Sequence, residues 1–238
     1  MKISRYLKTI TAIGCAALIA LLNGCAGGTG TALKPADRAS IRTVSVNSHV
    51  SKPDHMTCLD NTRRWKATAA GVVVGGVVTA GIVGSNLSKT APGGVQLDQA
   101  MARNGATVDR IVRDAFTDEL RKSGVFAVTT GGGDAQFVLS IRTYGLTVGG
   151  NLFDKRLAPN LAVAAELVRA DGTHVWKAMR SAISFAGLNR GHPEIIFIGR
   201  GQAHQFEEFQ NNPQLLKSAF AAAAQVVAQS LIAELKRY

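Results

Sequence analysis

The 238-residue chain lacks several features on which particular classes of protein depend. It has only three cysteines, too few for a disulfide scaffold in a chain of this length. Charged residues make up only 18% of the chain and hydrophobic residues 46%, and this composition excludes a disordered chain. Acidic residues are scarce, with 16 against 27 Lys and Arg, so anionic partners are favoured although none is specified. The length suffices for one sizeable domain or two small ones.

Motifs of common catalytic sites are also missing. The chain contains no Gly-x-Ser-x-Gly, no Gly-Lys-Ser/Thr after a glycine-rich loop, and no His-Glu-x-x-His. Asp134 follows the run 131–133 of three glycines, where a phosphate-binding loop needs a lysine and a hydroxyl. We therefore expect a protein without enzyme activity and without a cofactor.

Histidines occur in two groups that could form a metal or ligand site. His55 and Cys58 have the spacing of metal ligands and His49 precedes them, but a tetrahedral site needs four ligands and no second pair is near. We therefore expect no metal site. A second mixed cluster is more typical of a solvated surface, although an envelope enzyme or small-ligand binder that uses the loop 190–208 stays as a third hypothesis. Its members are His192, Glu194, His204, Glu207 and Glu208.

Residues 1–24 have the pattern of an export signal. Three cations precede an uncharged, mostly apolar run over 10–22, which is too short for a comfortable transmembrane helix. The run ends in Leu22-Asn23-Gly24-Cys25, which resembles the lipobox of bacterial lipoproteins. The resemblance implies cleavage before Cys25 and lipidation of its thiol; the alternative is an ordinary signal peptide with a chance cysteine.

The lipobox determines which partners we expect. Small Ala26 and Gly27 follow Cys25 with no Asp, as in lipoproteins sorted to the outer membrane, which implies a lipid-anchored chain facing the periplasm. Removal of the signal's three cations lowers the formal net charge from +11 to +8. An exported chain does not meet nucleic acid, so we expect membrane lipid, bound through Cys25, and other envelope proteins as partners. Cys58 is then the sole mature thiol besides Cys25, either inert or paired between protomers.

The mature chain divides into three parts. Residues 25–40 are small, polar and glycine-rich, which predicts a flexible tether. Residues 41–238 have the patterns of a periplasmic α/β domain. An apolar, glycine-rich insertion at 66–92 interrupts that domain.

The insertion contains 22 uncharged residues, 67–88, between Lys66 and Lys89. Small residues recur at every fourth position in two ladders, which would allow another helix to approach closely, as in glycine-zipper segments of envelope lipoproteins. Trp65 beside cations suits a membrane interface, and a helix of this length spans about 33 Å. We expect membrane or oligomer contacts from Trp65 and from Gly71, Gly75, Gly76, Ala80 and Gly84.

The sequence of residues 67–88 is compatible with several structures. A single crossing of the inner membrane would return residues 90–238 to the cytoplasm and leave three cations outside, which opposes the positive-inside tendency. The segment could pack as a helix against its own copies in a homo-oligomer. Its valines and glycines also suit two short strands turning near Gly75 and Gly76, as in a barrel hairpin from each subunit. A mobile or locally buried insertion is the remaining alternative.

The rest of the chain predicts a two-layer α/β sandwich. Apolar periodicity predicts a helix over 107–122, which Leu97–Ala102 extends upstream across Gly105. A last helix begins at Pro213, with Asn212 as its cap. Alternating residues predict strands over 41–50, 125–130, 136–148, 161–169 and 173–185. This order favours an α+β fold with a mostly antiparallel sheet and helices on one face, plus the glycine-rich insertion.

The combined pattern resembles a group of proteobacterial envelope lipoproteins. It rests on the lipobox, the helix ending in Glu119-Leu120-Arg121-Lys122-Ser123-Gly124-Val125-Phe126, and the strand pair around Leu167–Gly172 and Val175-Trp176. The group includes the curli-secretion lipoprotein, the penicillin-binding-protein activators and auxiliary lipoproteins of ABC-type transporters. The resemblance implies a periplasmic domain that docks on other proteins and lacks enzyme activity. The leading hypothesis is thus an assembly or transport accessory, and the alternative is an oligomeric secretion channel or pore component whose segment 67–88 enters the membrane.

Overall fold

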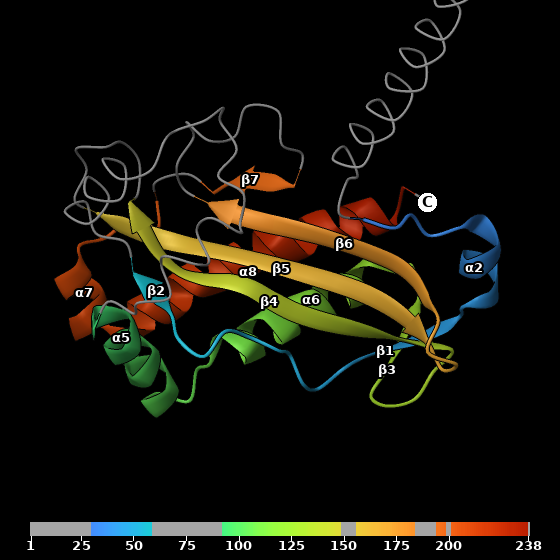
Figure 1. Ribbon diagram of the computed structural model, residues 1–238, viewed down its shortest axis with the longest axis horizontal. Coiled ribbons are helices and arrows are strands. Elements are labelled where there is room, and N and C mark those ends of the chain that lie inside the picture. Colours follow the sequence, from blue (N-terminus) through green and yellow to red (C-terminus); the bar gives the residue numbers. More distant parts are fainter. Residues whose placement is uncertain (1–29, 59–91, 149–155, 184–193, 199–200, 238) are drawn as a thin grey trace, which may run out of the picture. The chain divides into compact units, whose positions relative to one another are not determined.

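The computed structural model describes residues 30–58, 92–148, 156–183, 194–198 and 201–237. Figure 1 shows a twisted sheet with helices packed on one of its faces. All structural statements below concern these residues.

The sheet has seven strands in the order β3-β1-β4-β5-β6-β7, with β2 also paired to β4. Its centre consists of three long antiparallel strands: β4 (Ala135–Val148), β5 (Leu157–Arg169) and β6 (His174–Ile183). Four short strands pair in parallel around them: β1 (Thr43–Val46), β2 (Thr57–Cys58), β3 (Ala127–Thr129) and β7 (Ile195–Phe197). Most residue pairs of the sheet are therefore antiparallel.

One face of the sheet is apolar because strand side chains alternate between faces. Phe137 of β4 lies opposite Leu167 of β5, and Trp176 of β6 lies opposite Leu167 from the other side. All three are fully buried, and the rings of Phe137 and Trp176 meet edge-on with centroids 6.0 Å apart.

Helices α6 (Val108–Ser123) and α8 (Pro213–Leu235) pack against each other and against this face. The described residues also form three shorter helices: α2 (Pro35–Ser40), α5 (Pro92–Arg103) and α7 (Phe206–Asn211). The predicted fold class, a two-layer α+β sandwich with helices on one face, is confirmed. The buried stripe of α8 includes Leu216, Phe220, Ala223, Val227 and Leu231.

Helix α8 is the only described helix that is long and apolar enough to cross a membrane. Half of its most apolar window is buried inside the domain, as expected for the core helix of a folded domain. Its start is the predicted one: Pro213 occupies the first turn, and Asn212 Oδ1 accepts a hydrogen bond from the Leu215 N–H at 3.2 Å.

The structure corrects two predicted boundaries. The strand expected over 41–50 is only Thr43–Val46 long, because Asn47 Oδ1 accepts a hydrogen bond from the His49 N–H at 2.9 Å and interrupts the pairing, which resumes as a single bridge between Ser51 and Ser140 of β4. The expected extension of α6 across Gly105 is a separate helix, α5, because Gly105 has φ +67° and breaks the helical path.

Two further segments are more ordered than their composition suggests. Residues 31–40 were predicted as tether, yet Leu33 is 1% exposed and α2 follows it, so the folded domain begins near Thr31. Strand β7, where the sequence predicted no strand, pairs in parallel with β6. Its three residues are too few for periodicity to show.

Candidate functional site

The sequence-predicted contact residues lie outside the described part of the chain. This applies to the lipidation site and to the whole set from the insertion, namely Cys25, Trp65, Gly71, Gly75, Gly76, Ala80 and Gly84. The structure does describe the residues on either side of the insertion, and these form the candidate site.

The two ends of the segment 59–91 are held against each other. Strand β2 ends at Cys58, just before this segment, and α5 begins at Pro92, just after it. A Cβ atom on Gly94 of α5 would lie 2.1 Å from the carbonyl oxygen of Met56. Only glycine permits this approach, so the residues that flank the segment 59–91 lie close together.

A second glycine fixes β2 to the central sheet. Thr57 lies opposite Gly145 of β4, and a Cβ atom there would lie 2.0 Å from the Thr57 carbonyl oxygen. The Thr57 hydroxyl also donates to the Tyr144 carbonyl oxygen at 3.1 Å. We call residues 56–58, 92–98 and 144–146 the insertion root.

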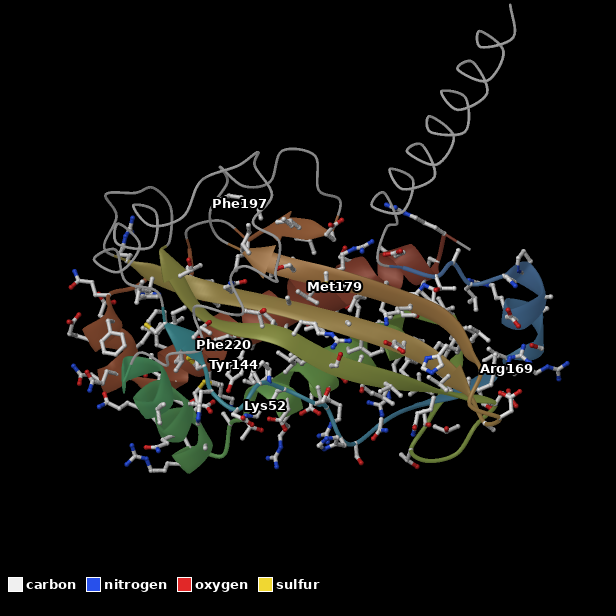
Figure 2. The ribbon with its side chains drawn as sticks, viewed as in Figure 1. Lys52, Tyr144, Arg169, Met179, Phe197 and Phe220 are labelled. Carbon is white, nitrogen blue, oxygen red and sulfur yellow. The ribbon has the colours of Figure 1, made fainter. Side chains whose placement is uncertain are left out.

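Tyr144 ties the insertion root to the core. Its ring is fully buried, and it meets Phe220 of α8 edge-on with centroids 6.5 Å apart. Its hydroxyl donates to Asp98 Oδ2 at 3.2 Å, and Lys52 Nζ lies 3.5 Å from that hydroxyl and 5.4 Å from the ring centroid (Figure 2). Burial, and then the charge of Asp98, raises the pKa of Tyr144, so the hydroxyl stays protonated and keeps donating.

The strand directions place the insertion root at one end of the sheet. Strands β2 and β4 run in parallel, and β6 runs the same way because both β4 and β6 are antiparallel to β5. The carboxyl ends of β2, β4 and β6 therefore share one end, which we call the insertion end (Figure 1). The turn between β5 and β6 marks the opposite hairpin end.

The N-terminal segment joins the domain near the hairpin end. Thr31 exchanges two backbone hydrogen bonds with Lys177 of β6, at 2.8 and 3.1 Å. Lys177 lies level with Glu166 of β5, whereas Gly145 at the insertion root lies level with Asn160. Six residues of β5 separate these levels, or about 20 Å along the strand.

Side chains on the sheet face away from the helices form ion pairs. Glu166 accepts from Lys177 Nζ and lies against His174 Nδ1, each at 2.8 Å, and these contacts, that of Lys177 above all, hold the pKa of Glu166 below its usual range. A shallow pocket of about 310 Å³ lies at the hairpin end of this face, between Ser45, Gln136 and Arg169. Its lining is more apolar than polar, and Arg169 is the one charged residue among the described residues that line it.

The described residues include no group of three or more His, Cys, Asp or Glu side chains placed to hold a metal ion. His49 and His55 are exposed, and Cys58 is half-buried at the end of β2. His192 lies outside the described ranges. His204 Nδ1 lies 3.0 Å from Glu208 Oε2, one helical turn along α7, which is a stabilising contact of a helix start.

The insertion root was missed in the sequence because its members are far apart. Pro92-Gly93-Gly94 indicated only that the insertion ended there, and Gly145 lay inside a strand of ordinary alternation. A glycine within a strand signals that another backbone approaches closely, and this was the available clue. No local pattern paired it with Thr57, 88 residues earlier.

Comparison with known proteins assigns no family. No protein-family model matches the chain, and no curated protein matches it. Similar solved structures include a PelC dodecamer from Paraburkholderia phytofirmans (9% identity, TM-score 0.39, covering 87% of this chain and 96% of that one). They also include protein XCC0632 from Xanthomonas campestris (11%, 0.44, 85% and 87%) and lipoprotein GNA1162 from Neisseria meningitidis (16%, 0.23, 59% and 81%). Every TM-score lies below 0.5, so these likenesses assign this chain no family and no function.

Proposed function

We propose that the chain is a lipid-anchored outer-membrane lipoprotein whose periplasmic domain acts as a non-enzymatic assembly or transport accessory through protein–protein contacts. The observation that carries this proposal is the insertion root. Two glycines hold β2 against α5 and β4, so the domain presents residues 59–91 from a fixed base. A rigid scaffold that fixes both ends of a long connecting segment suits recognition of another protein.

The position of the insertion root supports the same role. The N-terminal segment joins β6 at Lys177, and the insertion root lies about 20 Å away along the strands. A lipid on Cys25 would therefore hold the domain near its hairpin end and leave the insertion end available to a partner.

An oligomeric secretion channel or pore component is the second candidate. The two ladders of small residues within 67–88 favour it, because such stripes permit close packing of identical segments. The insertion root serves this function equally well, since it would place one segment from each subunit at equivalent positions.

Crosslinking in living cells distinguishes the two functions. A photoreactive residue replaces Val72 or Ile82, and adducts are identified by mass; the same residue at Lys122, exposed at the end of α6, is the control. Adducts to one different envelope protein, absent from the control, support the accessory function. A ladder of self-adducts supports the channel, and no specific adduct from either position contradicts both.

The anchor is tested separately. Cys25→Ser removes the thiol that would be acylated, so we expect loss of palmitate labelling and release of the chain from the membrane fraction. Replacing Cys58 by Ser is the matched control and leaves both unchanged. Palmitate labelling that persists in the Cys25→Ser chain contradicts the proposed anchor.

A further inference from the structure

Four cations surround the place where the N-terminal segment joins the domain. Lys34 and Arg38 belong to the segment around α2, and Lys236 and Arg237 follow the end of α8. We call these four residues the tether-side basic patch. Figure 1 shows the two segments side by side, although about 200 residues separate them in the chain.

Hydrogen bonds hold the two halves of the patch together. Arg38 Nη1 donates to the carbonyl oxygen of Leu235 at 3.3 Å, which satisfies one of the last carbonyls of α8. The Arg38 N–H donates to the Lys34 carbonyl at 3.0 Å, within α2. Lys34, Lys236 and Arg237 are exposed and Arg38 is half-buried, so all four charges are accessible to a partner.

The neighbouring acids do not neutralise the patch. Asp37 is engaged by Arg169 of β5 at 2.8 Å, and Glu234 pairs with Arg180 of β6. Among the described residues, none of the four patch cations forms an ion pair with a carboxylate. The four side-chain charges of the patch are therefore not offset by a carboxylate side chain paired with them.

We propose that the tether-side basic patch binds a membrane surface rich in anionic phospholipid and thereby fixes the orientation of the domain. The inference rests on the proposed function, because an acylated Cys25 brings the patch to such a surface. Cys25 precedes Thr31 by six residues, which span about 20 Å at most when fully extended. The acyl chain confines the domain near the membrane, and the patch selects which side faces it.

The expected strength follows from the number of charges. Each Lys or Arg near an anionic surface strengthens binding about fivefold, and the attraction decays within a Debye length of ~8 Å. Four cations would strengthen binding by roughly two to three orders of magnitude. High salt would remove most of this gain.

Vesicle sedimentation tests the patch without the acyl chain. The full mature chain carrying Cys25→Ala is mixed with vesicles of phosphatidylcholine alone, or with about one-third phosphatidylglycerol. An apolar contribution from residues 67–88 is common to both vesicle types, so their difference reports charge. We expect stronger binding to the anionic vesicles, and its loss in molar salt.

A matched pair of variants locates the effect. The patch variant carries Lys34→Gln, Arg38→Gln, Lys236→Gln and Arg237→Gln, and a triple variant that keeps Arg38 guards against loss of its bond to α8. The control removes the same charge from exposed cations of α5 and α6, with Arg103→Gln, Arg110→Gln, Arg121→Gln and Lys122→Gln.

The outcomes separate this proposal from the proposed function. A loss of tenfold or more in the patch and triple variants, with a change of less than threefold in the control, supports the patch. Equal losses in patch and control variants overturn it, since binding would then follow net charge alone. Equal binding of the parent chain to both vesicle types overturns it too. None of these results depends on acylation, which palmitate labelling decides.

Discussion

The two ends of the sheet are held together by different forces. At the insertion end, backbone packs on backbone: Gly94 and Gly145 let α5 and β4 approach the carbonyl oxygens of Met56 and Thr57. At the hairpin end, charged side chains bind the turns and the N-terminal segment. Asp134 Oδ2 accepts from the backbone N–H groups of Arg42 and Thr43 at 2.8 and 2.9 Å, and Arg169 binds Asp37.

This difference separates two kinds of sensitivity. Close packing of backbone atoms does not respond to pH or salt, but it fails when one methyl group is added. Charge-assisted contacts tolerate changes of shape and respond to pH and salt. We therefore expect the backbone contacts at Gly94 and Gly145, rather than the side-chain contacts of Tyr144 with Asp98 and Lys52, to persist over conditions that loosen the hairpin end.

The largest effect is expected at the insertion root. Gly145→Ala adds a Cβ atom that would lie 2.0 Å from the Thr57 carbonyl oxygen. Strand β2 must therefore move away from β4. We expect a loss of ~3 kcal/mol in the free energy of unfolding, measured by urea titration. Gly131→Ala is the control, because a Cβ there meets nothing within 4 Å, and it should change stability by less than about 0.5 kcal/mol. Equal stability of the two variants would contradict the described packing.

A smaller loss is expected at the start of the domain. The composition of residues 25–40 predicted a tether, but Leu33 is only 1% exposed. Leu33→Ala therefore removes a buried side chain. We expect a loss of ~2–3 kcal/mol in urea titrations. The exposed neighbour Lys34→Ala should cost less than about 0.5 kcal/mol. If Leu33→Ala is as harmless as its neighbour, residues 31–40 belong to the tether after all.

The ion pair between Arg169 and Asp37 should contribute less. Both side chains are partly exposed, at 31% and 25%, and their nearest atoms are 2.8 Å apart. A double-mutant cycle with Arg169→Met and Asp37→Ala is expected to give a coupling of ~0.5–1 kcal/mol. The coupling should shrink in molar salt. A coupling that is unchanged by salt would show that packing, rather than charge, joins α2 to β5.

The subtlest expected effect is on the pH dependence of stability. The backbone N–H groups of Thr43, then of Arg42, hold the pKa of Asp134 below its ordinary value of 3.8. Its stabilisation is therefore present above about pH 4 and is lost as the pH falls through the lowered pKa. Asp134→Asn should lose less stability than the parent chain between about pH 4 and pH 2. Identical acid unfolding profiles of the variant and the parent chain would contradict a stabilising role for the Asp134 carboxylate.

Local patterns in the sequence predicted most of the fold. The long strands and α6 and α8 follow from periodicity, and their ends follow from Gly124, Asn212 and Pro213, each acting on its own neighbours. Strands β2 and β7 were not predicted, because two or three residues are too few to show a period. Only their pairing with β4 and β6 makes them strands.

The candidate site was predictable only in outline. The apolar composition of 67–88 singled out the insertion, because an uncharged run of that length is visible in the sequence alone. The insertion root was not visible, because it depends on Gly94 and Gly145 meeting carbonyls of residues far away in the chain. The sequence also did not show that the four patch cations are neighbours, because only the folded chain places α2 beside the end of α8.

The central claim is that the domain presents the insertion from a root that folds without it. The most direct measurement replaces residues 67–88 by a Gly/Ser linker of equal length and records urea unfolding together with the mass of the particle in detergent. We expect a cooperative transition within about 1 kcal/mol of the parent chain, since the length of the closed loop is unchanged. Under the accessory function the mass also stays the same, and under the channel function an oligomer dissociates. Loss of cooperative unfolding would contradict the claim, because the insertion would then be part of the core.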